Sequence, residues 1–412
     1  MTKDSLEILH HLCGAIAQAS KLEEIYEIIL EEIVRVLGVT RASIMRLDPR
    51  NQVLRVVAAK GMDASLWKSV EIAVGEGVSG KVWQEGKPLL IKKMETKNPR
   101  YKTHSYMVAP VTCFPMKVGE VPIGLINLTD KKSGKPFTQD DLKLLMTISH
   151  QVASYMHIYD LIDRLKSAEQ AKVQLELARE IQQKLLPKCS PRVPGLDIAS
   201  FLLTAERVGA DYYDFLPGQG NPFGFCIADV SGHSVGGALL AFAIRSFLRS
   251  EIEKQKNPAQ VVEAANKNLF SDLSQSEQFI SLFLAFYYPE EKILNFSNAG
   301  HNPPLLVRAK DGRQELLLTQ DSLLGIDPAL DFHAKRVALN SGDCLVLYTD
   351  GLTEAQGQKN ERFGLKRVLK VVQEGTQKNA SELLQTLLSV WKDFTGDKAP
   401  QDDVTVMILK VT

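Results

Sequence analysis

The chain has 412 residues, of which 44% are hydrophobic, and its 49 basic residues balance its 49 acidic ones. This length exceeds what one hydrophobic core usually supports, so two or three domains are expected. The absence of net charge argues against a nucleic acid or an acidic membrane surface as partner and favours a protein or a small molecule.

The five cysteines are scattered without C-x-x-C spacing, which argues against a disulfide framework and against a structural zinc site. The first residues, MTKDSLEILHHLCGAIAQ, lack the basic start and apolar block of a signal peptide. No stretch reaches membrane-spanning length. We therefore expect a cytoplasmic protein without a membrane partner.

The first part of the chain shows helical and strand patterns in alternation. Apolar residues at helical spacing from Leu6 to Leu37 predict two helices with a break between them, and Gly75–Gly80 opens a short third helix. Thr138 and Asp141 resemble a capping box at the start of a closing helix. Strands paired as hairpins are expected at residues 42–47, 53–59, 108–116 and 121–128.

The closing helix has no proline or glycine before Pro187, which predicts one helix of roughly 45 residues and about 70 Å. Lys172 and Arg179 fall on the seam of its heptads, so two interpretations compete. The helix is either one strand of a dimeric coiled coil or a solvated connector.

After Pro187 the composition changes, and a second domain begins. Strands and helices alternate there as hairpins with segregated helices, which predicts an α+β domain built on antiparallel sheets. The strands are expected at 195–204, 224–229, 281–288, 293–298, 304–308, 332–338, 343–348 and 404–411, and the helices at 236–250, 259–272, 365–374 and 381–394.

Four acidic residues of this domain each adjoin an apolar strand pattern or a glycine-containing turn: Asp211, Asp229, Asp350 and Asp402. All four could meet at one sheet edge. Carboxylate oxygens suit hard cations such as magnesium or manganese, and a pair of these ions can activate a water for attack on phosphorus. For any single one of them, however, the ordinary interpretation is a turn residue, because Asp beside Gly is a common turn signal.

Five segments in this order resemble the SpoIIE/RsbU branch of the metal-dependent protein phosphatases, the PPM family, over residues 188–412. They are Val208-Gly-Ala-Asp-Tyr-Tyr-Asp214, Ile227-Ala-Asp-Val-Ser-Gly-His233, Asn298-Ala-Gly-His-Asn-Pro303, Leu347-Tyr-Thr-Asp-Gly-Leu-Thr-Glu354 and Asp402-Asp-Val-Thr-Val406. The resemblance implies an α-β-β-α sandwich with two manganese or magnesium ions at one end. It implies that Asp229 bridges both ions, that Asp211 and the Val230 carbonyl bind one ion, and that Asp350 and Asp402 bind the other.

The same resemblance makes Asp214 and Asp403 candidates for supporting the ligands. Two departures from the family pattern stand at Ala210 and Ser234, where the family usually has glycine; an added side chain is tolerable there unless the backbone needs positive φ. Every expected carboxylate remains.

The sequence does not decide which residue, if any, donates a proton to the leaving group, and two histidines of these motifs are candidates. His233 and His301 are candidates for a general acid, but a histidine in a glycine-rich turn is as often structural. Asn298 and Asn302 are expected to brace the loop that holds His301.

Residues 4–157 resemble a GAF domain. The residues that carry this resemblance are the helix and hairpin at the start, the loop Gly75-Glu-Gly-Val-Ser-Gly-Lys-Val-Trp83, the hairpin from Pro115 to Asn127 and the helix start Phe137-Thr-Gln-Asp-Asp141. Such domains hold small ligands, cyclic nucleotides among them, or serve as dimerisation units. Nothing in the sequence selects a ligand, and Cys13 and Cys113 are interpreted as small buried hydrophobic residues.

We thus expect a GAF sensory domain in residues 1–157, a helical connector in 158–187 and a phosphatase domain in 188–412. By resemblance, the substrate is a phosphoserine or phosphothreonine on a STAS-type anti-sigma-factor antagonist, and the connector of a homodimer is the switch. The alternative is a catalytically silent scaffold that binds a phosphoprotein. A cyclic-nucleotide phosphodiesterase ranks last, because its histidine-and-aspartate metal cluster has no counterpart in this sequence.

Overall fold

The computed structural model describes residues 21–48, 50–92, 105–113, 121–216, 222–232, 235–254, 257–396 and 398–412. The chain divides into two compact units, Met1–Gln170 and Ala171–Thr412. Among the described helices, none is long and apolar enough to cross a membrane. The expected helix before residue 21, His233, Ser234 and the turns at Pro49 and Gly119 lie outside the described residues.

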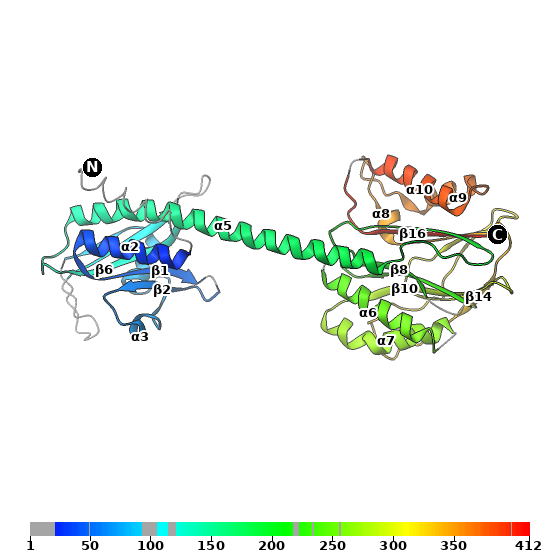
Figure 1. The fold of residues 1–412 in the computed structure, drawn as a ribbon, viewed down its shortest axis with the longest axis horizontal. Helices are drawn as coiled ribbons and strands as arrows, with labels where there is room; N and C mark the ends of the chain where they lie inside the picture. Colours follow the sequence, from blue (N-terminus) through cyan, green and yellow to red (C-terminus); the bar gives the residue numbers. More distant parts are fainter. Residues whose placement is uncertain are drawn as a thin grey trace. The chain divides into compact units, whose positions relative to one another are not determined.

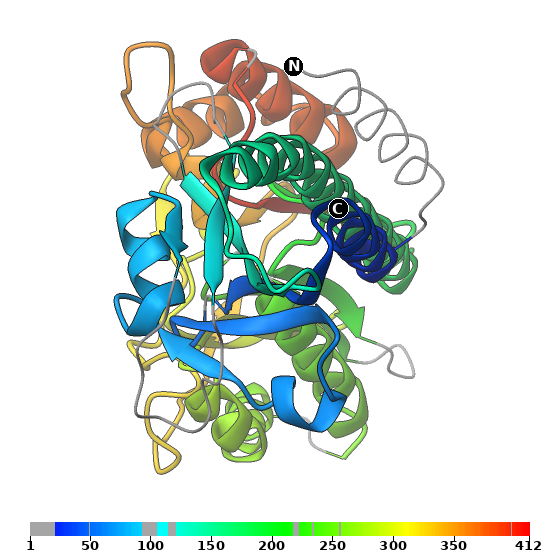
Figure 2. The same ribbon diagram turned by 90° about the vertical axis from the view of Figure 1, so that its left-hand side faces the viewer.

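The first unit is built on a six-stranded antiparallel sheet with the order β3-β2-β1-β6-β5-β4. Its strands are β1 (Val39–Asp48), β2 (Val53–Lys60), β3 (Glu71–Ala73), β4 (Leu89–Ile91), β5 (Tyr106–Cys113) and β6 (Val121–Lys131). Its helices are α2 (Leu22–Leu37), α3 (Ala64–Trp67), α4 (Gly77–Glu85) and the first part of α5 (Gln139–Leu185). Figure 2 shows α2 beside α5 on one face of the sheet, and one core cluster joins these three elements.

The helix α5 has 47 residues and confirms the long helix predicted from the sequence. Its start is fixed by the expected capping box, since the backbone N–H of Asp141 donates to Thr138 Oγ1 at 3.3 Å and that of Thr138 donates to Asp141 Oδ2 at 2.7 Å. Within the first unit, Arg46 forms an ion pair with Asp160 of this helix at 2.7 Å.

The second unit is a sandwich of two five-stranded antiparallel sheets. One sheet has the order β14-β11-β10-β9-β8 and the other the order β13-β12-β15-β16-β7. The strands are β7 (Leu196–Leu203), β8 (Asp211–Leu216), β9 (Phe223–Val230), β10 (Ile280–Tyr288), β11 (Ile293–Ala299), β12 (Leu305–Val307), β13 (Gln314–Leu316), β14 (Lys335–Ala338), β15 (Cys344–Tyr348) and β16 (Val404–Val411).

Helices cover both outer faces of the sandwich, as Figure 1 shows. The helices α6 (Val235–Glu251) and α7 (Pro258–Gln275) pack on the β8–β11 sheet. The helices α9 (Gly364–Glu374) and α10 (Ala380–Thr395) pack on the β15–β16 sheet, and the short α8 (Asp350–Glu354) follows β15. A third cluster of apolar residues fills the space between the sheets. The predicted α-β-β-α sandwich is confirmed.

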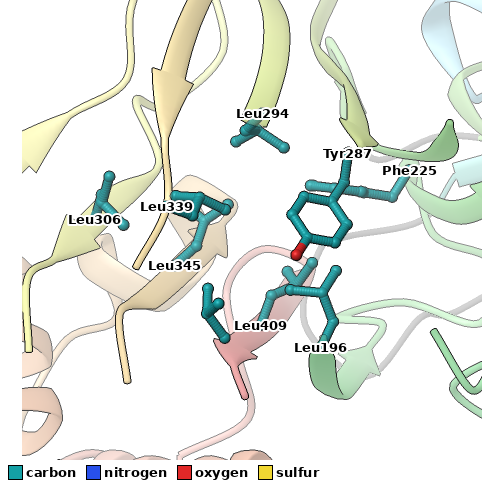
Figure 3. A pocket seen from close by; sticks show the side chains of 9 residues that line it. Leu196, Phe225, Tyr287, Leu294, Leu306, Leu339, Leu345 and Leu409 are labelled. Carbon is teal, nitrogen blue, oxygen red and sulfur yellow. The ribbon is translucent and has the colours of Figure 1, made fainter. Parts of the chain in front are cut away.

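A small apolar cavity of about 10 Å³ lies between the two sheets. Figure 3 shows the Tyr287 hydroxyl directed among leucines, and this hydroxyl has no hydrogen-bond partner within the described residues. The cavity has room for about one water and no charged lining residue, so it offers no group for catalysis or metal binding.

Candidate functional site

Asp211 and Asp229 lie directly opposite each other on the neighbouring strands β8 and β9. Side chains alternate along a strand, and Phe225 and Ile227 of β9 point into the space between the sheets. Asp229 shares this face, and Asp211, its direct cross-strand partner, does too. Two carboxylates therefore stand side by side at one end of the sandwich.

Asp211 is bonded to the opposite sheet. Its Oδ2 accepts hydrogen bonds from Thr349 Oγ1 at 2.8 Å and from Thr405 Oγ1 at 2.5 Å, and its side chain is almost fully buried. Thr349 follows β15 and Thr405 belongs to β16, so hydroxyls from two strands hold one oxygen of this carboxylate. Its other oxygen, Oδ1, remains available as a ligand atom.

Asp403 holds the segment that leads into β8. Its carboxylate accepts hydrogen bonds from the backbone N–H groups of Ala205 at 2.8 Å, Ala210 at 2.6 Å and Asp211 at 3.3 Å. A carboxylate that receives several N–H groups is a strong local anchor. The prediction that Asp403 supports the other carboxylates agrees with this geometry.

Asp350 and Asp402 come from two segments that pack against each other. A Cβ atom added to Gly351 would lie 2.0 Å from the backbone oxygen of Asp403, so the turn after β15 touches the segment that leads into β16. Asp350 begins α8, and Asp402 directly precedes Asp403. The contact needs glycine at position 351 and brings these two carboxylates to the same end of the sandwich.

Neighbouring carboxylates perturb Asp211, Asp229 and Asp350 electrostatically. Burial, followed by the charges of Asp350 and Asp402, raises the pKa of Asp229 to about 7. Burial and the neighbouring Asp229 raise the pKa of Asp211 well above its ordinary value, and burial with Asp402 raises that of Asp350. Each charge that shifts the pKa of Asp229 belongs to another carboxylate. Repulsion between neighbouring carboxylates of this kind is what a bound metal ion relieves.

The side chains do not form a closed ligand cage by themselves. Among the described residues, no group of three His, Cys, Asp or Glu side chains is arranged to hold a metal ion. Magnesium and manganese usually keep several waters and need only a few protein oxygens, so an open set of carboxylates and a backbone carbonyl such as that of Val230 suits them chemically.

Gln182, near the end of α5, is a residue of this site that the motifs did not indicate. Its Nε2 donates to the carbonyl of Gly209 at 2.7 Å, its Oε1 accepts from the N–H of Gly209 at 3.0 Å, and its side chain is only 4% exposed. Gly209 lies two residues before Asp211. The end of the helix therefore fixes the loop that delivers one of the four carboxylates.

Asp214 has a different role from the one predicted. It lies on the outer face of β8, where its oxygens accept from Arg249 at 2.6 and 2.8 Å and from the Tyr212 hydroxyl at 2.7 Å. This ion pair, whose carboxylate is fully buried, ties β8 to α6 and faces away from Asp211, since residues three apart on a strand point to opposite sides. The prediction that Asp214 supports the other carboxylates was wrong.

Ala210 fits its position without strain, because it is not among the residues with positive φ.

Of the two predicted histidines, His301 is buried, its backbone N–H donates to Asn298 Oδ1 at 2.8 Å, and its Nδ1 contacts Ser281 Oγ at 2.8 Å. Burial lowers the pKa of His301 to about 4. It is therefore neutral near pH 7 and carries no proton to donate as an imidazolium. Asn298 braces the loop as expected.

A second cluster of polar side chains lies in the first unit, between α4 and the sheet. Asn127 Oδ1 accepts from Ser79 Oγ and from the Tyr106 hydroxyl, each at 2.9 Å. The buried Nδ2 of Asn127 has no partner within the described residues. Native proteins seldom leave such a donor unpaired, so this position is a candidate for contact with a ligand.

Comparison with known proteins gives separate matches for the two units. Residues 219–412 match the family model for Stage II sporulation protein E (SpoIIE), and residues 21–156 match that for the GAF domain. The SiaA-PP2C domain of Pseudomonas aeruginosa has a TM-score of 0.54 and 20% identity, over 60% of this chain and 99% of that domain. This likeness shows the PP2C fold.

Two curated relatives come from Bacillus subtilis (strain 168). The "Phosphoserine phosphatase RsbU" is 28% identical over 247 residues, which are 59% of this chain and 71% of the relative. The "Phosphoserine phosphatase RsbP" is 28% identical over 188 residues, which are 44% of this chain and 46% of the relative. The chain thus spans about half the length of RsbP.

Proposed function

We propose that the chain is a metal-dependent, GAF-regulated phosphoprotein phosphatase, because residues 219–412 match the SpoIIE family model and residues 21–156 match the GAF family model. The observation that carries this proposal is the set of carboxylates at one end of the sandwich, in which Asp229 has a pKa raised to about 7 by burial and by other carboxylates. Perturbed groups of this kind are typical of functional sites.

The proposed metal ligands follow the family assignment. Asp229 would bridge two manganese or magnesium ions, Asp211 and the Val230 carbonyl would bind one of them, and Asp350 and Asp402 would bind the other. When bound, such a pair of ions supplies a water nucleophile of lowered pKa and neutralises charge on the phosphoryl group.

The chain's own residues would give this site its rigidity. Thr349 and Thr405 hold one oxygen of Asp211, and Asp403 holds the backbone before it. These bonds favour one orientation of the ligand oxygens and reduce the cost of reorganisation during reaction. His301 would keep its loop in place instead of delivering a proton, because burial keeps it neutral. A role for His233 in proton transfer stays a prediction.

We propose a phosphoserine or phosphothreonine of a partner protein as the substrate. The names of RsbU and RsbP support phosphoserine, and the resemblance to their branch suggests a STAS-type anti-sigma-factor antagonist. The proposed location is the cytoplasm, because the cysteines that the structure describes as free, Cys189, Cys226 and Cys344, suit a reducing compartment.

Regulation would begin in the GAF domain and pass through α5. A small molecule with a hydrogen-bond acceptor for Asn127 Nδ2 is the proposed ligand. The helix exposes apolar side chains at helical spacing, and such a stripe supports the dimeric coiled coil over the solvated connector. These side chains are Ile158, Leu161 and Leu165. A change in helix pairing could then bias the loop that Gln182 holds.

The test is hydrolysis of p-nitrophenyl phosphate and of a phosphoserine protein in the presence of manganese. Wild type is compared with Asp229→Asn and Asp350→Asn, and each variant's folding is checked by circular dichroism. We expect turnover that requires manganese and is lost in both variants. Binding of the phosphoprotein without turnover, under conditions that saturate the GAF domain with its ligand, would instead support the silent scaffold.

A further inference from the structure

A cavity of about 390 Å³ lies beside Asp402 in the second unit. It is lined by the end of α8, residues of α10 and the segment 398–402 that leads into β16. Its volume falls within the range of about 300–1,000 Å³ that is typical of ligand-binding clefts. A phosphoryl group alone would leave most of this space empty.

One wall of the cavity is a short hairpin held by its own backbone. The N–H of Phe363 donates to the Ala355 carbonyl at 2.9 Å, and the N–H of Gly357 donates to the Glu361 carbonyl at 2.9 Å. Lys398 Nζ donates to the carbonyl of Gly357 at 2.7 Å and so ties the hairpin to the opposite segment. The cavity is therefore built before any ligand arrives.

The charges on the lining favour a negatively charged ligand. Arg362 and Glu354 neutralise each other in an ion pair at 2.6 Å. Lys398 forms no ion pair with any residue that the structure describes, and Asp402 is assigned to a metal ion by the proposed function. The remaining charge is the Lys398 ammonium group, which donates to the Gly357 carbonyl and has further N–H donors for a ligand.

The lining also offers an apolar surface. Trp391 is 7% exposed and lines the cavity together with Ala355, Ala399 and Pro400. The buried Nε1–H of Trp391 has no acceptor within the described residues. An aromatic wall and one ammonium group are the features that an extended peptide with an apolar and an acidic side chain would satisfy.

We propose that this cavity binds the polypeptide segment next to the phosphorylated residue of the substrate, with an apolar side chain against Trp391 and an acidic side chain at Lys398. This inference rests on the proposed function and extends it. It proposes that residues 398–402, Trp391 and the hairpin determine which amino acids are preferred next to the phosphorylated residue of the substrate. The carboxylates would act on the phosphoryl group, while the cavity would select the protein that carries it.

The experiment uses two fluorescein-labelled phosphoserine peptides that differ only in having glutamate or lysine beside a shared leucine. Fluorescence anisotropy measures binding to full-length wild-type protein with manganese, and both peptides carry the non-hydrolysable phosphonate analogue of phosphoserine so that the readout does not require turnover. Lys398→Gln removes the charge and keeps a hydrogen-bond donor. Lys310→Gln, in the exposed turn before β13, is the matched control for the same chemical change. Ala399→Trp fills the cavity.

We expect the acidic peptide to bind about fivefold more tightly than the basic one, as one exposed charge pair allows. Lys398→Gln should remove this preference, Lys310→Gln should keep it, and Ala399→Trp should weaken both peptides about tenfold or more. Equal binding of the two peptides, or unchanged binding in Ala399→Trp, would overturn the inference. Lys310→Gln should hydrolyse p-nitrophenyl phosphate like wild type. Absence of that hydrolysis in wild type would refute the proposed function while leaving the binding result to stand separately.

Discussion

Replacing Gln182 with alanine should weaken metal binding without touching any proposed ligand. The substitution removes the partners of both backbone groups of Gly209, which are bonded at 2.7 and 3.0 Å in a buried position. A buried group left without a partner costs about 1–3 kcal/mol, and water entering the space recovers part of this. We therefore expect the loss of both hydrogen bonds to cost about 2 kcal/mol of free energy in total. If all of it opposes the metal-bound arrangement of the Asp211 loop, the affinity for manganese falls about 30-fold.

The assay is the manganese dependence of p-nitrophenyl phosphate hydrolysis, with thermal unfolding measured on the same samples. Gln183→Ala is the matched control, because Gln183 is the same residue type one position further along α5 and is exposed. Gln182→Ala should need more manganese for half-maximal activity and approach the wild-type rate when manganese is in excess. An unchanged manganese dependence for Gln182→Ala, equal to that of Gln183→Ala, would refute the claim that the end of α5 positions Asp211.

Three further predictions concern single residues of the phosphatase unit. The pKa of Asp229 is raised to about 7, so between its ordinary value near 4 and about pH 7 the folded, metal-free chain binds more protons than the unfolded chain. The free energy of unfolding should therefore fall as pH rises through this window, while the affinity for manganese should rise. Asp229→Asn should flatten the dependence of the free energy of unfolding on pH, as measured by urea unfolding. Gly351→Ala would place a methyl group 2.0 Å from the Asp403 carbonyl and should reduce manganese-dependent hydrolysis at least about tenfold, and wild-type kinetics would contradict the contact. Asp214→Asn breaks the pair with Arg249 and should lower the free energy of unfolding by about 3 kcal/mol in urea titrations, and a selective loss of manganese affinity at full stability would show that Asp214 serves the metal site after all.

Much of the fold could be predicted because its elements carry strong local signals. The strand Val404–Val411 was expected at these bounds, and α5 was expected from unbroken helical spacing that ends before Pro187. The strand β8 was missed because its sequence, DYYDFL, puts a carboxylate on each face: Asp211 points between the sheets and Asp214 towards α6. Alternation of apolar and polar residues, the usual sign of a strand, is absent there.

The candidate site could be predicted only as far as its motifs reach. The motifs contain the acidic residues together with Thr349, Thr405 and Asp403, but they do not show which of these groups bond to one another. Thr349 and Thr405 bond to Asp211 across 138 and 194 positions of the chain, and such contacts have no local signal in a single sequence. Gln182 lies in the predicted connector helix without a signal of its own, and only its burial against Gly209 distinguishes it from Gln183.

The most direct test of the two-metal account is a calorimetric titration of the metal-free, full-length protein with manganese, performed on wild type and on Asp229→Asn. The account predicts two ions per chain for wild type and, because Asp229 would bridge both, an affinity for each ion that falls by about a hundredfold or more in the variant. A wild-type protein that binds fewer than two ions, or a variant that binds manganese as wild type does, would contradict it.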